Sequence, residues 1–260
     1  MSDQKQPGGR MRYADAPERR ARLEREIAER GYLSSAEAAL LLGVSEMTVR
    51  RDLRMLETDG LARRVAGGAT AVTDAVPFER RDQLGAAQKR AIARCAAEEV
   101  AAAGTIALDA GTTVAAVVEL LPSPAIVSHS LPVIETLTRQ SSPRLIAIGG
   151  HYQPDTRSFA GPLAEQAMRE VRCDVALLSA TAVDERGLWS ANALDASIKR
   201  VLIQQAARTI LLADAGKLSA SATARIAGLD AIDMLITDSR ADEALLAPLG
   251  AAGITVRVAE

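Results

Sequence analysis

Three arginines, Arg50, Arg51 and Arg54, lie close together in a segment that has the periodicity of a helix. At about 100° per residue they fall on one side of that helix, and Val49, Leu53 and Leu56 fall on the other. An apolar face of this kind holds a helix to its domain. A guanidinium can donate two parallel hydrogen bonds to guanine in the major groove. The segment therefore predicts a DNA-reading helix, although arginine runs also occur on helix faces that only meet solvent.

Each residue type in and around this segment suits a different DNA contact. Met47 can touch a thymine methyl group, and Arg50 or Arg51 can bond to guanine. Hydroxyl groups at the helix start and arginines beyond its end can hold phosphates. Replacement of Arg51 by Ala is expected to cost roughly 1–3 kcal/mol in operator binding. The predicted DNA-contacting residues are Ser45, Met47, Thr48, Arg50, Arg51, Arg54, Arg63, Arg64, Gly67 and Gly68.

The surrounding segments predict a small domain that positions this helix. A first helix is expected over residues 17–30, ending at Gly31. A second helix starts at Ser34 or Ser35, and Ser45 caps the third helix, 46–58. Residues 61–69 predict two strands joined at Gly67 and Gly68, where a tight turn needs glycine. Three helices followed by a hairpin make a winged helix-turn-helix.

A second set of polar residues follows apolar strands in the remainder of the chain. Asp109-Ala-Gly-Thr-Thr113 stands between a strand, 105–108, and a helix, 113–121, so backbone amides and two hydroxyls are available to an anion. A plain glycine turn with a threonine cap would show the same residues. Polar residues also follow other strands, and the carboxyl ends of parallel strands share one edge. The predicted effector-binding residues are Asp109, Gly111, Thr112, Thr113, Ser128, His129, Ser130, Gly149, Gly150, Asp184 and Lys217.

Short apolar strands alternate with helices from residue 86 onward, which predicts an α/β domain with a mainly parallel sheet. The expected strands are 105–108, 125–127, 145–148, 175–178, 210–213, 234–237 and 255–258. The expected helices are 86–103, 113–121, 132–140, 162–171, 193–207 and 242–252. The predicted organisation is a flexible tail at 1–15, a winged helix-turn-helix at 16–71, a linker at 72–85 and an effector-sensing, oligomerising domain at 86–260.

The whole-chain composition sets limits on the class of protein. The 260 residues carry a net charge of −2, which argues against a protein that coats nucleic acid. No apolar run reaches the roughly 18 residues of a membrane helix, and the N-terminus lacks a signal-peptide pattern. Cys95 and Cys173 have no neighbours at metal-ligand spacing, so they are expected to be buried thiols. We therefore expect a cytoplasmic protein without a cofactor or metal.

The chain resembles the DeoR family of bacterial transcription regulators over nearly its whole length from about residue 17. In the DNA-binding part the resemblance rests on Ser45-Glu-Met-Thr-Val-Arg-Arg-Asp-Leu53, Arg63-Arg64-Val65 and Gly67-Gly68-Ala69. In the remainder it rests on Pro77-Phe-Glu-Arg-Arg81, Gln88–Ala93, Asp109–Thr113, Ser130-Leu-Pro132, Gly149-Gly150, Gly161-Pro162, Lys199-Arg200 and Asp214–Lys217.

This resemblance implies a sensor domain similar to sugar-phosphate isomerases and a repressor released by a phosphorylated sugar or a related metabolite. The chain departs from the family pattern at Ala66, where His is usual, and at His129, where Asn is usual. The stretch Ser179–Asp184 lacks the glycines usual there. These changes put the common wing contact and the common effector in question.

The expected partners are double-stranded operator DNA, a phosphorylated sugar and further copies of the chain. A dimer or tetramer is expected because one small winged domain makes too few contacts for tight binding. Activation in place of repression stays open. Two alternatives remain at this point. One is a sugar-phosphate isomerase fused to a DNA-binding domain, with Asp184 and Lys217 moving protons. The other is an architectural DNA protein without an effector.

Overall fold

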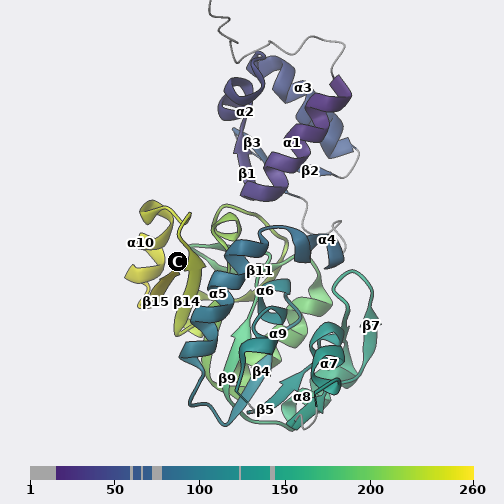
Figure 1. The fold of residues 1–260 in the computed structure, drawn as a ribbon, viewed down its shortest axis with the longest axis vertical. Helices are drawn as coiled ribbons and strands as arrows, with labels where there is room; N and C mark the ends of the chain where they lie inside the picture. The colour runs from purple at the N-terminus through teal and green to yellow at the C-terminus, as the bar shows by residue number, and fades with distance from the viewer. Residues whose placement is uncertain (1–15, 59–60, 66, 72–77, 123, 141–143) are drawn as a thin grey trace, which may run out of the picture. The chain divides into compact units, whose positions relative to one another are not determined.

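The chain forms two compact units, Met1–Ala75 and Val76–Glu260, each with its own hydrophobic core (Figure 1). The computed structural model describes residues 16–58, 61–65, 67–71, 78–122, 124–140 and 144–260. The predicted tail at 1–15 lies outside the described residues, as do Gly60 and Ala66.

The first unit is a winged helix-turn-helix, as predicted. Its helices are α1 (Ala16–Arg30), α2 (Ser35–Leu42) and α3 (Glu46–Thr58), and its strands are β1 (Tyr32–Ser34), β2 (Ala62–Val65) and β3 (Gly68–Ala71). The antiparallel strands lie in the order β1-β3-β2. Strand β1 was not predicted, because three residues carry too little pattern to be recognised before their partner is known.

Local sequence explains how α2 begins and ends. Ser34 is its N-cap, since Ser34 Oγ accepts from Glu37 N at 3.1 Å while Glu37 receives the Ser34 N–H in return at 3.2 Å. Gly43 ends the helix with a φ of 64°, a left-handed conformation that glycine adopts without strain. These signals set the length of the turn between α2 and α3.

A buried ion pair fixes α3 against α1. Arg19 Nε lies 2.5 Å from Asp52 Oδ2, and a second guanidinium nitrogen donates to Asp52 Oδ1 at 3.1 Å. Both residues are buried. The planar guanidinium matches the carboxylate in a bidentate manner, so the pair constrains the rotation of α3 as well as its position.

The second unit is built on a seven-stranded parallel sheet in the order β15-β14-β12-β9-β4-β5-β6. Its strands are β4 (Thr105–Leu108), β5 (Ala125–Ser128), β6 (Arg144–Ala147), β9 (Cys173–Leu178), β12 (Ala206–Leu212), β14 (Met234–Asp238) and β15 (Thr255–Ala259). The predicted parallel α/β fold is confirmed.

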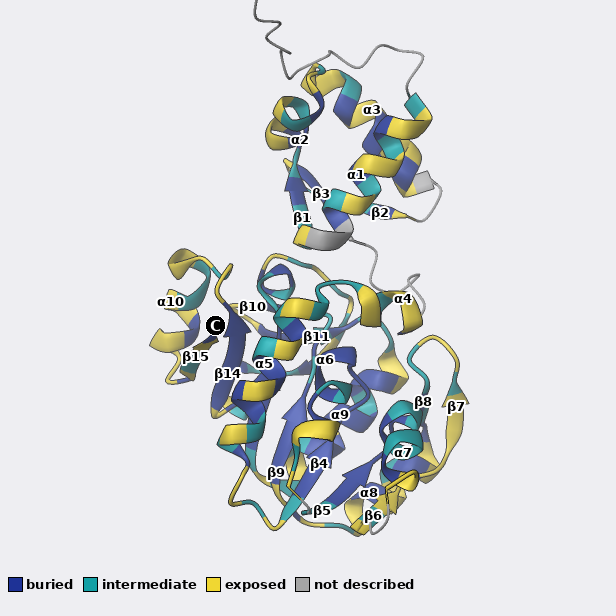
Figure 2. Ribbon diagram, in the orientation of Figure 1, coloured by how far each residue is buried: buried dark blue, intermediate teal, exposed yellow. Residues whose placement is uncertain are grey.

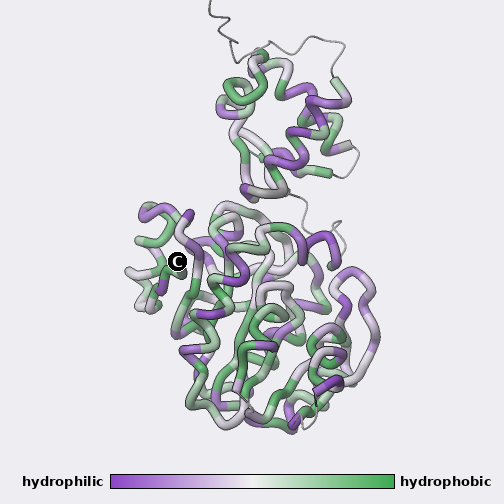
Figure 3. Tube along the Cα trace, viewed as in Figure 1, coloured by the Kyte–Doolittle hydropathy of each residue, from purple (hydrophilic) through white to green (hydrophobic). Residues whose placement is uncertain are grey.

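Helices cover both faces of this sheet. They are α5 (Ala86–Glu99), α6 (Thr112–Ala115), α7 (Leu131–Thr138), α8 (Pro162–Arg169), α9 (Ala193–Gln205) and α10 (Glu243–Ala251), with 3-10 turns η2 (Val118–Leu120), η3 (Ala215–Leu218) and η4 (Leu229–Ala231). Alternate strand residues enter different cores. Ile106 packs with α5, whereas Ala107 packs with α8 and α9. The central strands are accordingly buried and apolar (Figures 2 and 3).

Several elements differ from the predicted ones. Residues 78–83 were assigned to a linker but form helix α4 (Phe78–Gln83), with the Phe78 side chain buried. Short antiparallel strands were also missed. They are β7 (His151–Gln153), β8 (Ser158–Ala160), β10 (Ala182–Asp184), β11 (Gly187–Ser190) and β13 (Ala224–Ala227). The helix predicted at 113–121 is the short α6 followed by η2.

The strand order reverses between β4 and β9. The chain runs from β4 outward through β5 to β6 and then returns to place β9 on the other side of β4. In open α/β sheets, the loops that follow the two strands at such a point diverge, and ligands bind beside their carboxyl ends. Here those loops begin at Asp109 and Ser179.

Candidate operator and effector sites

The exposed side of α3 carries the predicted DNA-reading residues. Val49, Leu53 and Leu56 are buried with Asp52, while Met47 is 81% exposed. By helical geometry, Met47, Arg51 and Arg54 lie centrally opposite the buried stripe, with Arg50 at its border. There an Arg50 guanidinium nitrogen lies 3.1 Å from Glu46 Oε2, one turn earlier. Arg51 therefore faces more directly away from the buried side of α3 than Arg50 does.

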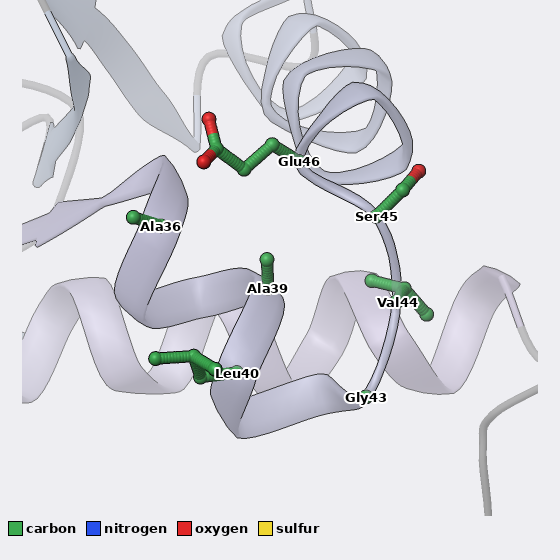
Figure 4. Close-up of a pocket in the computed structure, with 7 residues that line it drawn as sticks. All are labelled: Ala36, Ala39, Leu40, Gly43, Val44, Ser45 and Glu46. Atoms are coloured by element: carbon green, nitrogen blue, oxygen red, sulfur yellow. The ribbon is translucent and has the colours of Figure 1, made fainter.

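Ser45 and Thr48 form the N-terminal cap of α3. Ser45 Oγ accepts from Thr48 N at 3.2 Å and lies 3.0 Å from the Thr48 hydroxyl. Both side chains sit at the helix start, where phosphates bind in other DNA-binding helices. An open pocket formed by α2 and the start of α3 is lined by Ala36, Ala39, Leu40, Gly43, Val44, Ser45 and Glu46 (Figure 4).

The wing is a hairpin in which β2 ends shortly before Gly67 and β3 begins at Gly68. Gly67 has a φ of 84°, a conformation that favours glycine. A Cβ on Gly68 would lie 2.3 Å from the Leu33 carbonyl oxygen, so only glycine allows β3 to approach β1 this closely. Arg64 is tied to the end of α3, because Arg64 N donates to Glu57 Oε1 at 3.0 Å. Arg63 lies on the same strand.

Asp109 is the centre of a buried polar cluster at the point where the sheet order reverses. Its Oδ2 accepts from Ser179 N at 2.9 Å, from Ser179 Oγ at 2.5 Å and from Lys199 Nζ. Its Oδ1 lies 3.3 Å from His129 Nε2. Asp195, one turn before Lys199 in α9, lies 3.5 Å from the same ammonium group. Three side chains from three separate segments, His129, Ser179 and Lys199, therefore surround one carboxylate.

Electrostatics favour the charged forms of Asp109 and Lys199. Burial alone would raise the pKa of Asp109, but Lys199 and His129 outweigh it and hold that pKa well below its ordinary value. Burial opposes the charge of Lys199 as well, yet Asp109 and Asp195 raise its pKa above the usual value. Both shifts favour the charged forms of the two groups.

The structure brings together only some of the predicted effector residues. Asp109 and His129 meet in the cluster, and the Gly111 backbone packs so closely on Ser179 that an added Cβ would lie 2.3 Å from Ser179 Oγ. Thr112 and Thr113 are buried at the start of α6. Ser128 Oγ donates to the Leu108 carbonyl at 2.8 Å. Ser130 Oγ is buried without a hydrogen-bond partner among the described residues.

The other predicted residues lie around this centre or away from it. Lys217 is in η3, which contacts the strand that ends at Asp184. Asp184 accepts from Trp189 Nε1 at 2.8 Å. Gly149 has open space around it, whereas Gly150 packs against Ala160 and Ala164 on the side of β8 and α8.

Lys199, Asp195 and Ser179 were not among the predicted site residues. A signal for Lys199 was present, because a lysine on the buried side of α9 beside Ile198 and Leu202 needs a partner. Asp195 stands four residues before it, at the spacing of an ion pair on a helix. His129 is fully buried, with Nδ1 2.9 Å from the Phe159 carbonyl oxygen, so its ring is held by protein groups on both sides.

Comparison with known proteins identifies the two units. Residues 19–75 match the DeoR-like helix-turn-helix domain, and residues 85–239 match the DeoR C terminal sensor domain. The chain belongs to the DeoR family of transcription regulators. This DeoR-family chain is 32% identical to the transcriptional repressor AccR of Agrobacterium fabrum, over 88% of its own length and 92% of that protein's.

Other relatives act on transcription in both directions. The L-fucose operon activator of Haemophilus influenzae is 30% identical over 82% of this chain and 88% of its own length. The transcriptional repressor CsqR of Escherichia coli is 32% identical over 84% of this chain and 86% of its own. A solved ribose 5 phosphate isomerase A from Neisseria gonorrhoeae aligns over 53% of this chain and 54% of its own, at 19% identity and a TM-score of 0.36.

Among the described residues, no helix combines the length and apolar character needed to cross a membrane. Nor do the described ranges contain a group of three or more His, Cys, Asp or Glu residues arranged to hold a metal ion.

Proposed function

We propose that this regulator represses a carbohydrate-metabolism operon and is released from its operator by a phosphorylated sugar. We further propose that it acts in the cytoplasm as a dimer or tetramer that places two copies of α3 in paired half-sites. Most of the relatives named above are repressors, and one is named for a sugar operon. The proposal of repression over activation rests on those names, because an activator could have the same two units.

One observation carries the sensing half of this proposal. The Asp109 cluster lies at the carboxyl edge of the sheet where the strand order reverses, beside the amides and hydroxyls of Thr112 and Thr113 and the unpaired hydroxyl of Ser130. A buried hydroxyl without a partner costs free energy, which a ligand hydroxyl or phosphate oxygen would recover. Hydroxyls, amides and the Lys217 ammonium match the oxygen-rich surface of a phosphorylated sugar.

The experiment is a thermal-shift screen of the full chain against phosphorylated and unphosphorylated aldoses and ketoses. Hits are then titrated by tryptophan fluorescence. Trp189 is the only tryptophan of the chain, and it donates a hydrogen bond to Asp184, one of the predicted effector-binding residues. We expect a phosphorylated sugar to raise the melting temperature and Lys217→Ala to weaken the response. Arg169→Ala, on α8, serves as the control. The architectural alternative predicts no shift with any compound in the panel.

We also propose that the sensor unit binds its sugar without converting it. A proton-transfer catalyst works best with a pKa near the working pH. The mutual attraction of Asp109 and Lys199 moves both pKa values away from that range, that of Asp109 downward and that of Lys199 upward. An isomerase would have to rely on Asp184 and Lys217 instead, and we expect incubation with aldose and ketose phosphates to give no isomerisation. Turnover that disappears in Lys217→Ala would establish the enzyme alternative instead.

A further inference from the structure

Helix α4 is the first described element after the DNA-binding unit, and it belongs to the sensor unit. Whatever holds α4 therefore fixes the point at which the connection from the DNA-binding unit reaches the sensor. The helix has six residues and buries one of them, Phe78. A helix this short is unstable alone, so its position depends on a few tertiary contacts.

Arg157 supplies the central contacts to α4. Its guanidinium carbon lies 6.0 Å from the centre of the Phe78 ring, and a guanidinium nitrogen lies 3.5 Å from Glu79 Oε1. A second guanidinium nitrogen donates to both carboxylate oxygens of Glu135, at 3.0 and 3.2 Å. Cation–π attraction and two ion pairs thus meet at one side chain.

The backbone at Arg157 is also unusual. Its φ is 48°, and Arg157 is the one non-glycine residue with positive φ in the described part of the chain. Such a conformation costs free energy and persists where the surrounding contacts over-determine it. The guanidinium carbon of Arg81, in α4, lies 5.7 Å from the centre of the same Phe78 ring, and Arg81 donates to the Asp155 carbonyl of this turn at 2.9 Å.

The turn that carries Arg157 leads directly to the Asp109 cluster. Phe159, two residues later, donates its N–H to the His129 carbonyl at 2.9 Å, and its own carbonyl lies 2.9 Å from His129 Nδ1. His129 Nε2 then faces Asp109. Helix α4 has further contacts to the sensor unit. Lys89 Nζ donates to the Arg81 and Asp82 carbonyls, and α4 contacts α6.

We propose that Arg157 is a positioning residue that docks α4 onto the sensor unit, and that the Asp109–His129–Phe159 contacts transmit changes at the effector site to this docking. The transmission half rests on the proposed function, while the docking half does not. In this scheme a displaced His129 shifts β8, Arg157 follows, and α4 loses its anchor. Helix α4, through which the chain enters the sensor unit, is then no longer held to the rest of that unit.

Hydrogen–deuterium exchange of the full chain, without effector, tests the docking. The wild type is compared with Arg157→Ala and with Arg169→Ala, which removes an exposed arginine of the same unit that pairs within α8. Loss of charge-assisted bonds should speed exchange in residues 78–84 by about tenfold or more. Exchange in α8 should stay unchanged, and Arg169→Ala should leave residues 78–84 unchanged. If α4 exchanges in the Arg157→Ala variant at the same rate as in the wild type, the proposal is overturned.

If Arg157→Ala also loosens α8, the variant Arg157→Lys decides. Lysine keeps the positive charge but lacks the planar fork whose separate nitrogens reach Glu79 and Glu135, so exchange of α4 should fall between the wild type and Arg157→Ala. The DNA readout uses an operator selected from random sequences with the wild-type protein. Arg157→Ala should alter the preferred half-site spacing and leave affinity for a single half-site unchanged. An equal loss on both DNAs indicates general destabilisation and overturns the positioning role.

The transmission half has its own variants. His129→Ala removes both contacts of the ring, and His129→Asn keeps a smaller polar side chain in case the alanine variant does not fold. Each should speed exchange in residues 78–84, and unchanged exchange there overturns transmission through His129. Because none of these measurements uses a sugar phosphate, a failed effector screen cannot be mistaken for a failure of the docking.

Discussion

Arg50 and Arg51 are adjacent in sequence but differ in their surroundings. Arg50 lies at the edge of the exposed face, paired with Glu46, whereas Arg51 lies opposite the buried stripe of α3. Recognition of guanine needs a guanidinium that projects centrally into the groove. We expect Arg51 to be the base-reading residue of the two, because it lies nearer the centre of the face opposite the buried residues Val49, Leu53 and Leu56.

We predict that Arg51→Ala weakens operator binding by roughly 1–3 kcal/mol and relaxes the base preference at one position, because a bidentate base contact is lost. Arg50→Ala should cost less and act equally on all sequences. Gel-shift titrations on the selected operator and on single-base variants, at fixed salt, measure both effects. A larger loss of base preference in Arg50→Ala would reverse this assignment.

Lys89 gives a pH-dependent prediction. Burial lowers the pKa of Lys89 to about 8 from the ordinary lysine value of 10.5. Between these values the unfolded chain holds a proton that the folded chain has released, so folding becomes more favourable as pH rises. Relative to Lys89→Met, the wild type should gain about 2 kcal/mol of unfolding free energy between about pH 7 and about pH 10. Urea titrations of both proteins measure this, and a difference independent of pH would contradict it.

At the scale of elements, the wing depends on one close backbone approach. An added Cβ at Gly68 meets the Leu33 carbonyl oxygen at 2.3 Å and the Ser34 Cα at 2.8 Å, and neither can move without separating β1 from β3. At Gly67 the nearest atom is the Tyr32 hydroxyl at 3.5 Å, so a substitution there meets backbone strain alone.

We therefore predict that Gly68→Ala lowers operator affinity at least about tenfold, through a displaced wing, while Gly67→Ala costs about 1 kcal/mol of stability. Fluorescence anisotropy with labelled operator and thermal unfolding of both variants provide the comparison. Equal effects of the two substitutions would show that the β1–β3 approach does not set the wing position.

The elements that the sequence analysis missed share a physical cause. Strands β7, β8, β10, β11 and β13 have three or four residues each, which is too short for an alternating pattern to be recognised. Strands β7 and β8 pair with each other, as do β10 and β11, whereas β13 pairs with β11 from a distant part of the chain. Helix α4 was interpreted as linker because its residues are mostly charged and follow Pro77. One buried ring and contacts to Arg157 and Lys89 make it a helix.

At the scale of the whole molecule, the two units can act as a switch only if their ligands are thermodynamically linked. If a phosphorylated sugar weakens operator binding by a given factor, operator DNA must weaken sugar binding by the same factor. A factor of about 5–150 is typical of such coupling.

We predict this reciprocity for the sugar phosphate found in the screen. Calorimetric titration of that compound into the free protein and into the protein–operator complex should give dissociation constants that differ by the same factor as the two operator affinities. Identical sugar affinities in the two titrations would contradict coupling, even if the compound binds the sensor unit. Arg157→Ala should reduce the factor toward one.

The sequence by itself determined the local features of this protein. Helix periodicity defined the two faces of α3, serine and glycine marked the helix ends, and apolar strands alternating with helices indicated the parallel sheet. Each of these follows from interactions between residues close in the chain. The Asp109 cluster and the docking of α4 were decided only by tertiary structure. Asp109, His129, Ser179 and Lys199 span 90 positions, and no local pattern states which polar groups the packed sheet will bring within hydrogen-bond distance.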